Sequence, residues 1–420
     1  MILQNGIKPT LSLLSLFLAA SHLSASETEW QHEFSGVLDA RLTSADSLDS
    51  YVKGGTGRFR YSDGTNLSLA QVSAKYTLTY DKWSLHGVGT GYLDGENDAL
   101  GITEAFVRYR GVPNEDGLRH QFRGGIIYPK ISLENIATAW LSPYTITFST
   151  QNTWIGEEVR HAGLEWSMDW LGRSRGSKQD INITATAFQY NDPTGALLAW
   201  HGWTMSSRQT LWKEQLPFPI TPALLPGNML EQQAWVSDPF TELDSDFGFH
   251  TKMDWRWDKK LRLRLGHYDN LAADNIVIDG QYTWRTQFSH FGLEWRLDRQ
   301  TTIVSQFMTG DTRMRVMNDM DVVGLDFTNG FVLVSHAQAP HRFSIRYEQF
   351  NNEDFDNTPG DNNDDQGDAL TLSYHYNIGG GAYLMFEYNQ IDSLRPAQQY
   401  QSLATRQKES QLNAGIRYFF

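Results

Sequence analysis

The chain has 420 residues, no cysteine and a formal net charge of -14, and aromatic residues make up 13% of it. Its mean hydropathy of -0.46 excludes a bundle of membrane-spanning helices, because each such helix needs about 20 apolar residues. The acidic balance argues against a nucleic-acid binder, which needs basic groups to neutralise phosphates. The lack of cysteine excludes disulfide frameworks and cysteine-ligated metal centres.

An export signal is expected at the N-terminus. The first strongly apolar stretch, residues 11–20, follows Lys8 and precedes a run of small residues. A basic start, a short apolar core and a small-residue end are typical of a secretory signal, and this core is too short to cross a bilayer as a helix. We expect residues 1–25 to be a cleaved signal peptide and 26–420 to be the mature chain. A buried N-terminal helix is the alternative.

The mature chain repeats short segments in which apolar and polar residues alternate. In the last one, Leu412, Ala414, Ile416 and Tyr418 share a face with the terminal Phe420. Alternation with period two and one apolar face predicts a β-strand. About 16 strands are expected, near residues 33–43, 66–80, 83–92, 101–110, 118–128, 158–170, 180–190, 246–257, 260–270, 282–297, 300–309, 322–338, 341–351, 369–377, 381–391 and 408–420. The alternation breaks in 282–297 and 322–338, where we expect a bulge or a misplaced boundary.

The connections alternate between short and long. Tight turns are expected at residues 81–82, 258–259, 298–299, 339–340 and 379–380, whereas the loops between them include 129–157, 191–245 and 352–368. This rhythm predicts an all-β, transmembrane antiparallel β-barrel with short periplasmic turns and long extracellular loops. The polar faces carry Arg, Asp, Glu and His, which cannot pack a dry core unpaired. We therefore expect apolar side chains to face lipid and polar ones to line a wet lumen.

The whole mature chain resembles Gram-negative outer-membrane porins in its strand layout, its long third loop and its last strand, which ends at Phe420. The resemblance implies a homotrimer in the outer membrane, inserted by the barrel-assembly machinery that reads the C-terminal strand. It also implies that loop 129–157 folds into the barrel as a constriction. The chain is similar in size and pattern to the phosphate-selective porin family too, but it mixes acids among the bases of the expected lining.

The expected function is passive diffusion of small hydrophilic solutes and ions through a water-filled channel, without cofactor or metal. The inward bases outnumber the inward acids, which predicts a mild preference for anions. A balanced wall of paired charges, such as Asp254 against Arg264, is the alternative. The residues expected to line the pore or its eyelet are Lys75, Arg108, Arg119, Arg123, Arg262, Arg264 and Glu134.

A transverse field across the eyelet is a further expectation from the porin resemblance. In this interpretation the bases Arg108, Arg119 and Arg123 on the wall face the acids Glu134, Glu157 and Glu158 on the inserted loop. The alternative is that Glu157 and Glu158 simply begin the next strand at a wet rim.

Three other features leave alternatives open. Loop 191–245 is rich in tryptophan and proline, and we expect an ordered lid more than a site that stacks sugar rings. Loop 352–368 is acidic and is expected to be solvated, or to bind lipopolysaccharide loosely through divalent cations. The small outward residues expected to form a subunit interface, or else a thin lipid-facing wall, are Gly36, Ala40, Ala70, Ala74, Gly87, Gly89 and Gly91.

Two further functional classes remain as alternatives to a general porin: a substrate-specific porin for sugars or phosphate-like anions, and a non-conducting receptor or adhesin barrel. An enzyme is not expected, because the chain has no Gly-x-Ser-x-Gly motif and no zinc-type histidine spacing.

Overall fold

The computed structural model describes residues 29–316 and 320–420, so the predicted signal peptide 1–25 lies outside the described residues. Within these two ranges, none of the helices has both the length and the apolar character needed to cross a membrane.

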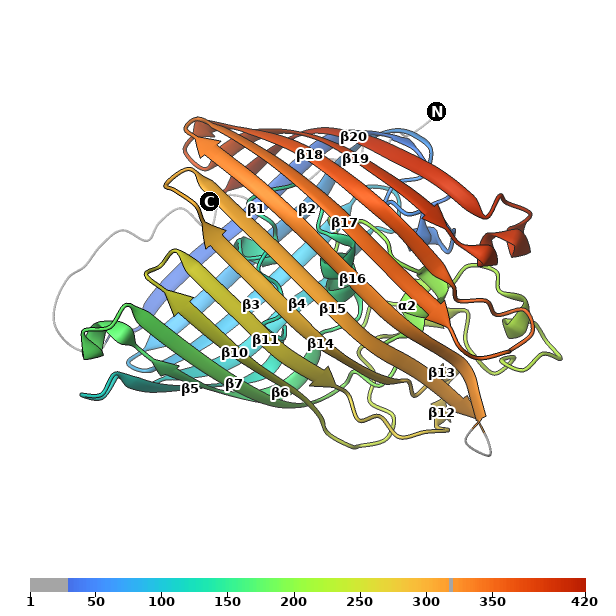
Figure 1. Ribbon diagram of the computed structural model, residues 1–420, viewed down its shortest axis with the longest axis horizontal. Helices are drawn as coiled ribbons and strands as arrows, with labels where there is room; N and C mark the ends of the chain where they lie inside the picture. The colour runs from blue at the N-terminus through green and yellow to red at the C-terminus, as the bar shows by residue number, and fades with distance from the viewer. Residues whose placement is uncertain (1–28, 317–319) are drawn as a thin grey trace, which may run out of the picture.

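Sixteen antiparallel strands of the described chain close into a single barrel, drawn in Figure 1 with its strands strongly tilted. They are β1 (Gln31–Asp46), β2 (Gly64–Tyr80), β3 (Trp83–Leu93), β4 (Ala99–Arg110), β5 (Leu118–Ile127), β6 (His161–Trp170), β7 (Gln179–Gln189), β10 (Gly248–Trp257), β11 (Leu261–Asp269), β14 (Arg285–Arg296), β15 (Thr301–Val316), β16 (Met320–Gln338), β17 (His341–Asp354), β18 (Asp365–Gly379), β19 (Ala382–Leu394) and β20 (Arg406–Phe419). Each pairs with its neighbours in chain order, and β1 pairs with β20 to close the ring. Every predicted strand overlaps one of these, so the predicted fold class is confirmed.

The short connections lie at one end of the barrel and the long loops at the other (Figure 1). Loop L3 (residues 128–160) joins β5 to β6, and loop L4 (residues 190–247) joins β7 to β10. Smaller elements within the loops and turns are η1 (Tyr51–Lys53), η2 (Thr138–Trp140), α1 (Thr150–Glu157), η3 (Gly172–Arg175), α2 (Ala196–His201), β8 (Leu216–Pro217), η4 (Pro222–Leu224), β9 (Val236–Ser237), β12 (Val277–Ile278), β13 (Gln281–Tyr282) and η5 (Pro396–Gln401). Helix α1 begins after Ser149, whose side chain accepts a hydrogen bond from the Asn152 backbone.

The two faces of the wall have opposite character, as the alternation predicts. On β20 the outward Leu412 and Ile416 are 58% and 51% exposed, whereas the inward Asn413 and Arg417 are 3% and 2% exposed. An apolar outer band and a polar inner face are typical of transmembrane barrels.

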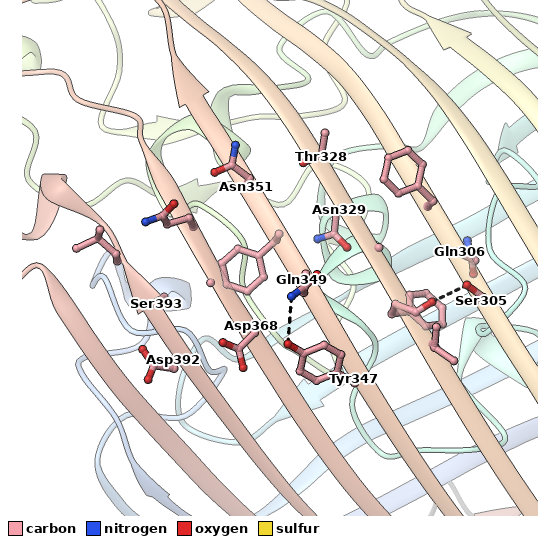
Figure 2. Close-up of a pocket in the computed structure, with 18 of the residues that line it drawn as sticks. Ser305, Gln306, Thr328, Asn329, Tyr347, Gln349, Asn351, Asp368, Asp392 and Ser393 are labelled. Atoms are coloured by element: carbon pink, nitrogen blue, oxygen red, sulfur yellow. Dashed lines mark hydrogen bonds between the residues drawn. The ribbon is translucent and has the colours of Figure 1, made fainter.

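The outer wall becomes polar above this band, toward the long loops. Gln349, Asn351, Asp368 and Asp392 line a groove of about 700 Å³ on strands β15 to β20 (Figure 2). The Gln349 amide donates a hydrogen bond to the hydroxyl of Tyr347, 3.2 Å away. These long strands therefore continue past the apolar band on the side of the loops.

Strand β14 keeps a continuous register with both neighbours, so the bulge predicted for 282–297 is wrong. The predicted boundary was misplaced, since β14 begins at Arg285, but Phe288 and Phe291 both lie within it, so this shift does not explain the change of parity. Phe288 faces inward and packs edge-on against Trp154 of L3, with 5.4 Å between ring centroids, whereas Phe291 faces outward. Strand β16 has a register shift near its loop end, opposite Met314 and Arg315. Much of the inward face of β16 is apolar, because Leu325, Phe327, Phe331 and Leu333 are buried there and Phe327 contacts Trp154. The breaks in the apolar–polar alternation therefore mark strands whose inner face packs against apolar side chains of L3 inside the barrel.

The predicted small-residue face is only partly present. A register shift between Leu69 and Val72 leaves Ala70 fully buried, so it does not belong to the outer surface. Gly36 is covered by the C-terminal residue, since an added Cβ would lie 2.4 Å from the ring of Phe420. The residues of this face that stay exposed are Ala40, Ala74 and Gly89.

Candidate functional site

Loop L3 crosses the lumen. It starts between β5 and β6 and reaches the strands that lie opposite them in the ring order. The Leu133 backbone donates to Oε1 of Gln306 on β15 at 2.8 Å, and the Thr147 backbone donates to Oε1 of Glu387 on β19 at 2.9 Å. The Thr150 backbone donates to Oε2 of Glu348 on β17 at 2.6 Å. The carboxylates of the far wall therefore hold the loop by its own backbone N–H groups.

Arg346 of β17 is the centre of this attachment and is fully buried. Its guanidinium pairs with Glu134 of L3 and with Glu348, and it donates to the backbone oxygens of Thr147 and Phe148 at 2.9 Å each. A buried cation with two carboxylates and further acceptors is satisfied, but losing one partner would leave uncompensated charge. The predicted eyelet residue Glu134 therefore fixes the loop to the wall.

The predicted wall bases Arg119 and Arg123 are neutralised by acids on the neighbouring strand β6. Arg123 binds both oxygens of Glu165 at 2.8 and 2.7 Å, and Arg119 binds Oδ2 of Asp169 at 2.9 and 2.6 Å. Arg108 is half-buried and donates to the hydroxyl of Ser84 at 3.2 Å. Because Arg119 and Arg123 pair with wall acids and Glu134 pairs with Arg346 on the other side of the ring, the predicted transverse field between these bases and the loop acids is wrong.

The predicted bases Arg262 and Arg264 share one acid with a lysine. Arg264 binds both oxygens of Asp254 at 2.8 and 3.0 Å, Lys252 binds Oδ2 at 2.7 Å, and Arg262 binds Oδ2 at 3.1 Å. The predicted pairing of Asp254 with Arg264 is confirmed. Arg264 also donates to the backbone oxygen of Ile131 in L3 at 3.1 Å, so this basic cluster supports the loop from a second side.

Glu157 and Glu158 neither face the wall bases nor begin the next strand, so both interpretations of them are wrong. They end helix α1 and are buried, while β6 starts at His161. Glu158 accepts hydrogen bonds from the backbones of Gly195 and Leu197 at 3.0 and 2.7 Å, and so caps α2 of L4. Burial raises the pKa of Glu158 to about 7 and that of Glu157 to about 8.

Loop L4 also enters the barrel. Trp200 and Trp203 at the end of α2 are 2% and 0% exposed, so neither ring has a free face for a sugar. The indole of Trp203 donates to Oδ1 of Asn352 at 2.7 Å, and that of Trp200 donates to Oδ1 of Asp361 at 2.9 Å. The expectation of an ordered lid holds for this part of the loop, but the lid lies within the barrel mouth.

From there L4 runs across the mouth to the opposite strands. The Gln209 backbone donates to the hydroxyl of Tyr92 on β3 at 3.0 Å, and the Trp212 backbone donates to the Ile102 oxygen on β4 at 2.9 Å. The two loops are joined where the Phe148 backbone donates to the Ser206 oxygen at 2.8 Å. We call residues 128–160 and 191–212 together the plug.

The plug divides the interior into two halves. Toward the loops, the inward side chains of the described wall are buried; they include Thr43, Tyr92, Phe188, Tyr268, Met308, Phe350 and Ile391. Toward the short turns, several inward bases are half-buried or exposed; they include Lys75, Arg108, Arg110, Arg256 and Arg342. The lumen is thus closed to large solutes at the loop end and open as a vestibule at the turn end.

The far-wall residues that anchor the plug, Arg346, Glu348 and Glu387, were not among the predicted pore and eyelet residues, whereas Glu134 and Arg264 were. Arg346 and Glu348 are two residues apart and therefore lie on the same face of β17. This spacing is the sequence pattern from which an inward charge pair could have been predicted. The buried loop base Arg58, which binds Asp365, carries no such signal because loops have no periodicity.

No family model and no curated protein matches the chain. Among solved structures, the outer membrane channel DcaP of Acinetobacter baumannii is similar at 10% identity and a TM-score of 0.56, over 94% of this chain and 99% of that one. The trimer form of OmpT, an outer membrane protein of Vibrio cholerae, is similar at 11% identity and a TM-score of 0.53, over 93% and 99%. An anion-selective porin from Comamonas acidovorans is similar at 10% identity and a TM-score of 0.51, over 93% and 100%. The likeness shows the fold: the chain folds as a sixteen-stranded barrel of the outer-membrane porin type.

Proposed function

We propose that this chain is a porin-type channel of the outer membrane that lets small hydrophilic solutes and ions diffuse through a narrow lumen. The supporting observation is a charged interior that opens at the turn end and is crossed by L3, which contacts both sides of the ring. A receptor needs no charged interior vestibule, whereas charged groups along a water-filled channel attract ions and set its selectivity.

A mild preference for anions belongs to the same proposal. Lys75, Arg108, Arg110, Arg256 and Arg342 border the vestibule, and none forms a salt bridge with a residue in the described ranges. Two vestibule acids, Asp169 and Glu294, are paired with arginine. Glu33 of β1 has no salt bridge among the described residues and offsets part of the charge of the nearby Arg108. The excess of free bases would raise the local concentration of anions.

The proposed location and partners follow the porin comparison. The small exposed residues Ala40, Ala74 and Gly89 leave the outer wall flat at this place, so two further copies could pack closely against it in a homotrimer. The polar groove above the apolar band would face lipopolysaccharide. The last strand, with Phe420 packed on Gly36, would be recognised by the assembly machinery after export.

The plug favours a second candidate, a barrel that binds a ligand outside and does not conduct. Residues 196–203 of L4 are buried within the mouth, so the channel would then need a rearrangement of L4 before it conducts. Substrate-specific transport of sugars or phosphate-like anions is a narrower form of the first proposal.

Single-channel recording in planar bilayers, with the reversal potential measured across a KCl gradient, tests these proposals. We expect small, stable conductance steps and a reversal potential whose sign shows that chloride is more permeant than potassium. The double variant Lys75→Gln/Arg108→Gln should shift the reversal potential toward cations, because it removes two unpaired vestibule charges. Arg299→Gln, in an exposed turn, is the matched control and should change nothing. Folded protein that never conducts would contradict the channel and favour the receptor.

A further inference from the structure

A cavity of about 640 Å³ lies beneath L3 at the turn end of the barrel. Its roof is the segment 136–143 of L3, and its walls come from the β16–β17 turn and the inner faces of β17 to β20. This volume falls in the range of pockets that enclose small organic molecules. The cavity opens into the vestibule and is separate from the charged cluster around Asp254 on β10 and β11.

One side of the cavity is basic. Arg342 is half-buried, donates to the Ser335 hydroxyl at 2.9 Å and lies over the Tyr144 ring at 5.5 Å. Arg417 is 2% exposed; its Nε donates to Oδ2 of Asp39 at 2.7 Å, while its buried Nη2 has no hydrogen-bond partner among the described residues. A buried unpaired N–H group costs free energy until it meets an acceptor.

The carboxylate of Asp39 does not neutralise this side. It is the acid facing Arg417, and it is shared with Arg41, which binds it at 3.0 Å. Arg342 forms no salt bridge within the described ranges. Two guanidinium groups therefore border the cavity, and the one carboxylate near them, Asp39, is also paired with Arg41, so a positive charge remains. The polar ring of His375 on β18 lies beside them.

The other side of the cavity is apolar. Ile136 and Pro143 come from the loop, and Met385 and Phe419 come from the wall. The Tyr383 ring stands edge-on to Phe419, with 6.1 Å between centroids, and extends this surface. A ligand that matches both sides must carry a negative group at one end and an apolar body at the other.

We propose that this cavity binds a small organic carboxylate with an apolar or aromatic body. The inference rests on the proposed channel function and names its solute class. A guanidinium matches a carboxylate through two parallel N–H···O bonds, and the half-buried Arg342 presents one to the cavity, while the charge of Arg417 behind it attracts the same anion. An inorganic anion would leave the apolar side empty, and a neutral sugar would leave the guanidinium charge uncompensated.

Titration calorimetry on the whole folded barrel in detergent tests this with three probes. We expect 2-naphthoate to bind at least about tenfold more tightly than its neutral isostere 2-naphthamide, because charged hydrogen bonds are lost with the carboxylate. Acetate, which has no apolar body, should also bind at least about tenfold more weakly. Equal binding of the amide, or equal binding of acetate, would overturn the proposal.

Two variants probe the two sides of the cavity. Arg342→Gln should weaken 2-naphthoate binding about tenfold, and Ile136→Ser should weaken it several-fold while leaving acetate unchanged. The matched control Arg296→Gln removes an arginine from β14, outside the cavity, and should bind as the unmodified protein does. Unchanged affinity in folded Arg342→Gln protein would overturn the assignment of this cavity.

Channel recordings separate this inference from the proposed function. Added 2-naphthoate should interrupt the current of the unmodified protein and have less effect on Arg342→Gln. Conductance without binding would overturn the carboxylate site and leave the channel intact. Binding without conductance would support the site and contradict the channel.

Discussion

The two halves of the barrel interior treat charge in opposite ways. In the loop half, Arg346 is fully buried, and each of its three guanidinium nitrogens donates a hydrogen bond to an acceptor. In the turn half, Arg256 is exposed and forms no salt bridge with a described residue. Burial makes pairing obligatory because an unpaired charge in a low dielectric is costly, whereas water allows a charge to stay free. The buried half therefore uses its charges to hold structure, and the wet half keeps its charges available for solutes.

The largest expected effect comes from Arg346→Ala. The change leaves Glu134 and Glu348 buried without their cation, which typically costs about 3–5 kcal/mol of folding free energy. We expect a lower free energy of unfolding in urea, followed by tryptophan fluorescence. We also expect larger and noisier conductance steps, since L3 loses its main attachment to β17.

If Arg346 only stabilised the fold and did not hold L3 in the lumen, the variant molecules that remain folded would conduct as the unmodified protein does. Unchanged steps in the folded variant would therefore contradict the assignment of L3 as the constriction. Equal stability of the variant and the unmodified protein would contradict the obligatory pairing of the loop half.

The second prediction concerns pH and the contact between L3 and L4. Burial raises the pKa of Glu157 and Glu158 to about 8 and about 7, above the usual carboxyl value of about 4.3. In the released plug both groups ionise near their usual value, whereas in the closed plug they keep their protons to higher pH. The closed plug is therefore most stable below about pH 4 and loses stability as pH rises toward 8.

We expect the average conductance to be higher at pH 8.5 than at pH 5 if L4 opens the mouth. The groups around these acids are Tyr51 and Arg208 near Glu157, and the indole of Trp154 together with the backbone of Leu197 at Glu158. Glu158→Gln keeps the shape without the charge, so its conductance should depend less on pH. A conductance that falls as pH rises would contradict this direction.

The strands could be predicted from sequence because alternation is a local property, and β20 shows it without interruption. The entry of L3 into the barrel was expected only from the porin resemblance. The contacts that hold the plug could not be predicted, because they join residues such as Thr147 and Glu387 across the ring, and no local pattern records them. One local signal was present: Phe288 and Phe327 break the outward apolar parity where the wall touches Trp154. An apolar residue on the polar face of a barrel strand can therefore indicate an apolar loop inside.

The smallest expected effect comes from Arg256→Ala, the same substitution in the wet half. Arg256 is exposed and unpaired among the described residues, so its loss should change the free energy of unfolding by less than about 0.5 kcal/mol. The reversal potential should move slightly toward cations, because one of several free bases is removed from the vestibule. The comparison with Arg346→Ala keeps the chemistry constant and changes only burial. If both variants lost similar stability, the water of the vestibule would not be screening Arg256, and the division of the lumen into a dry and a wet half would be wrong.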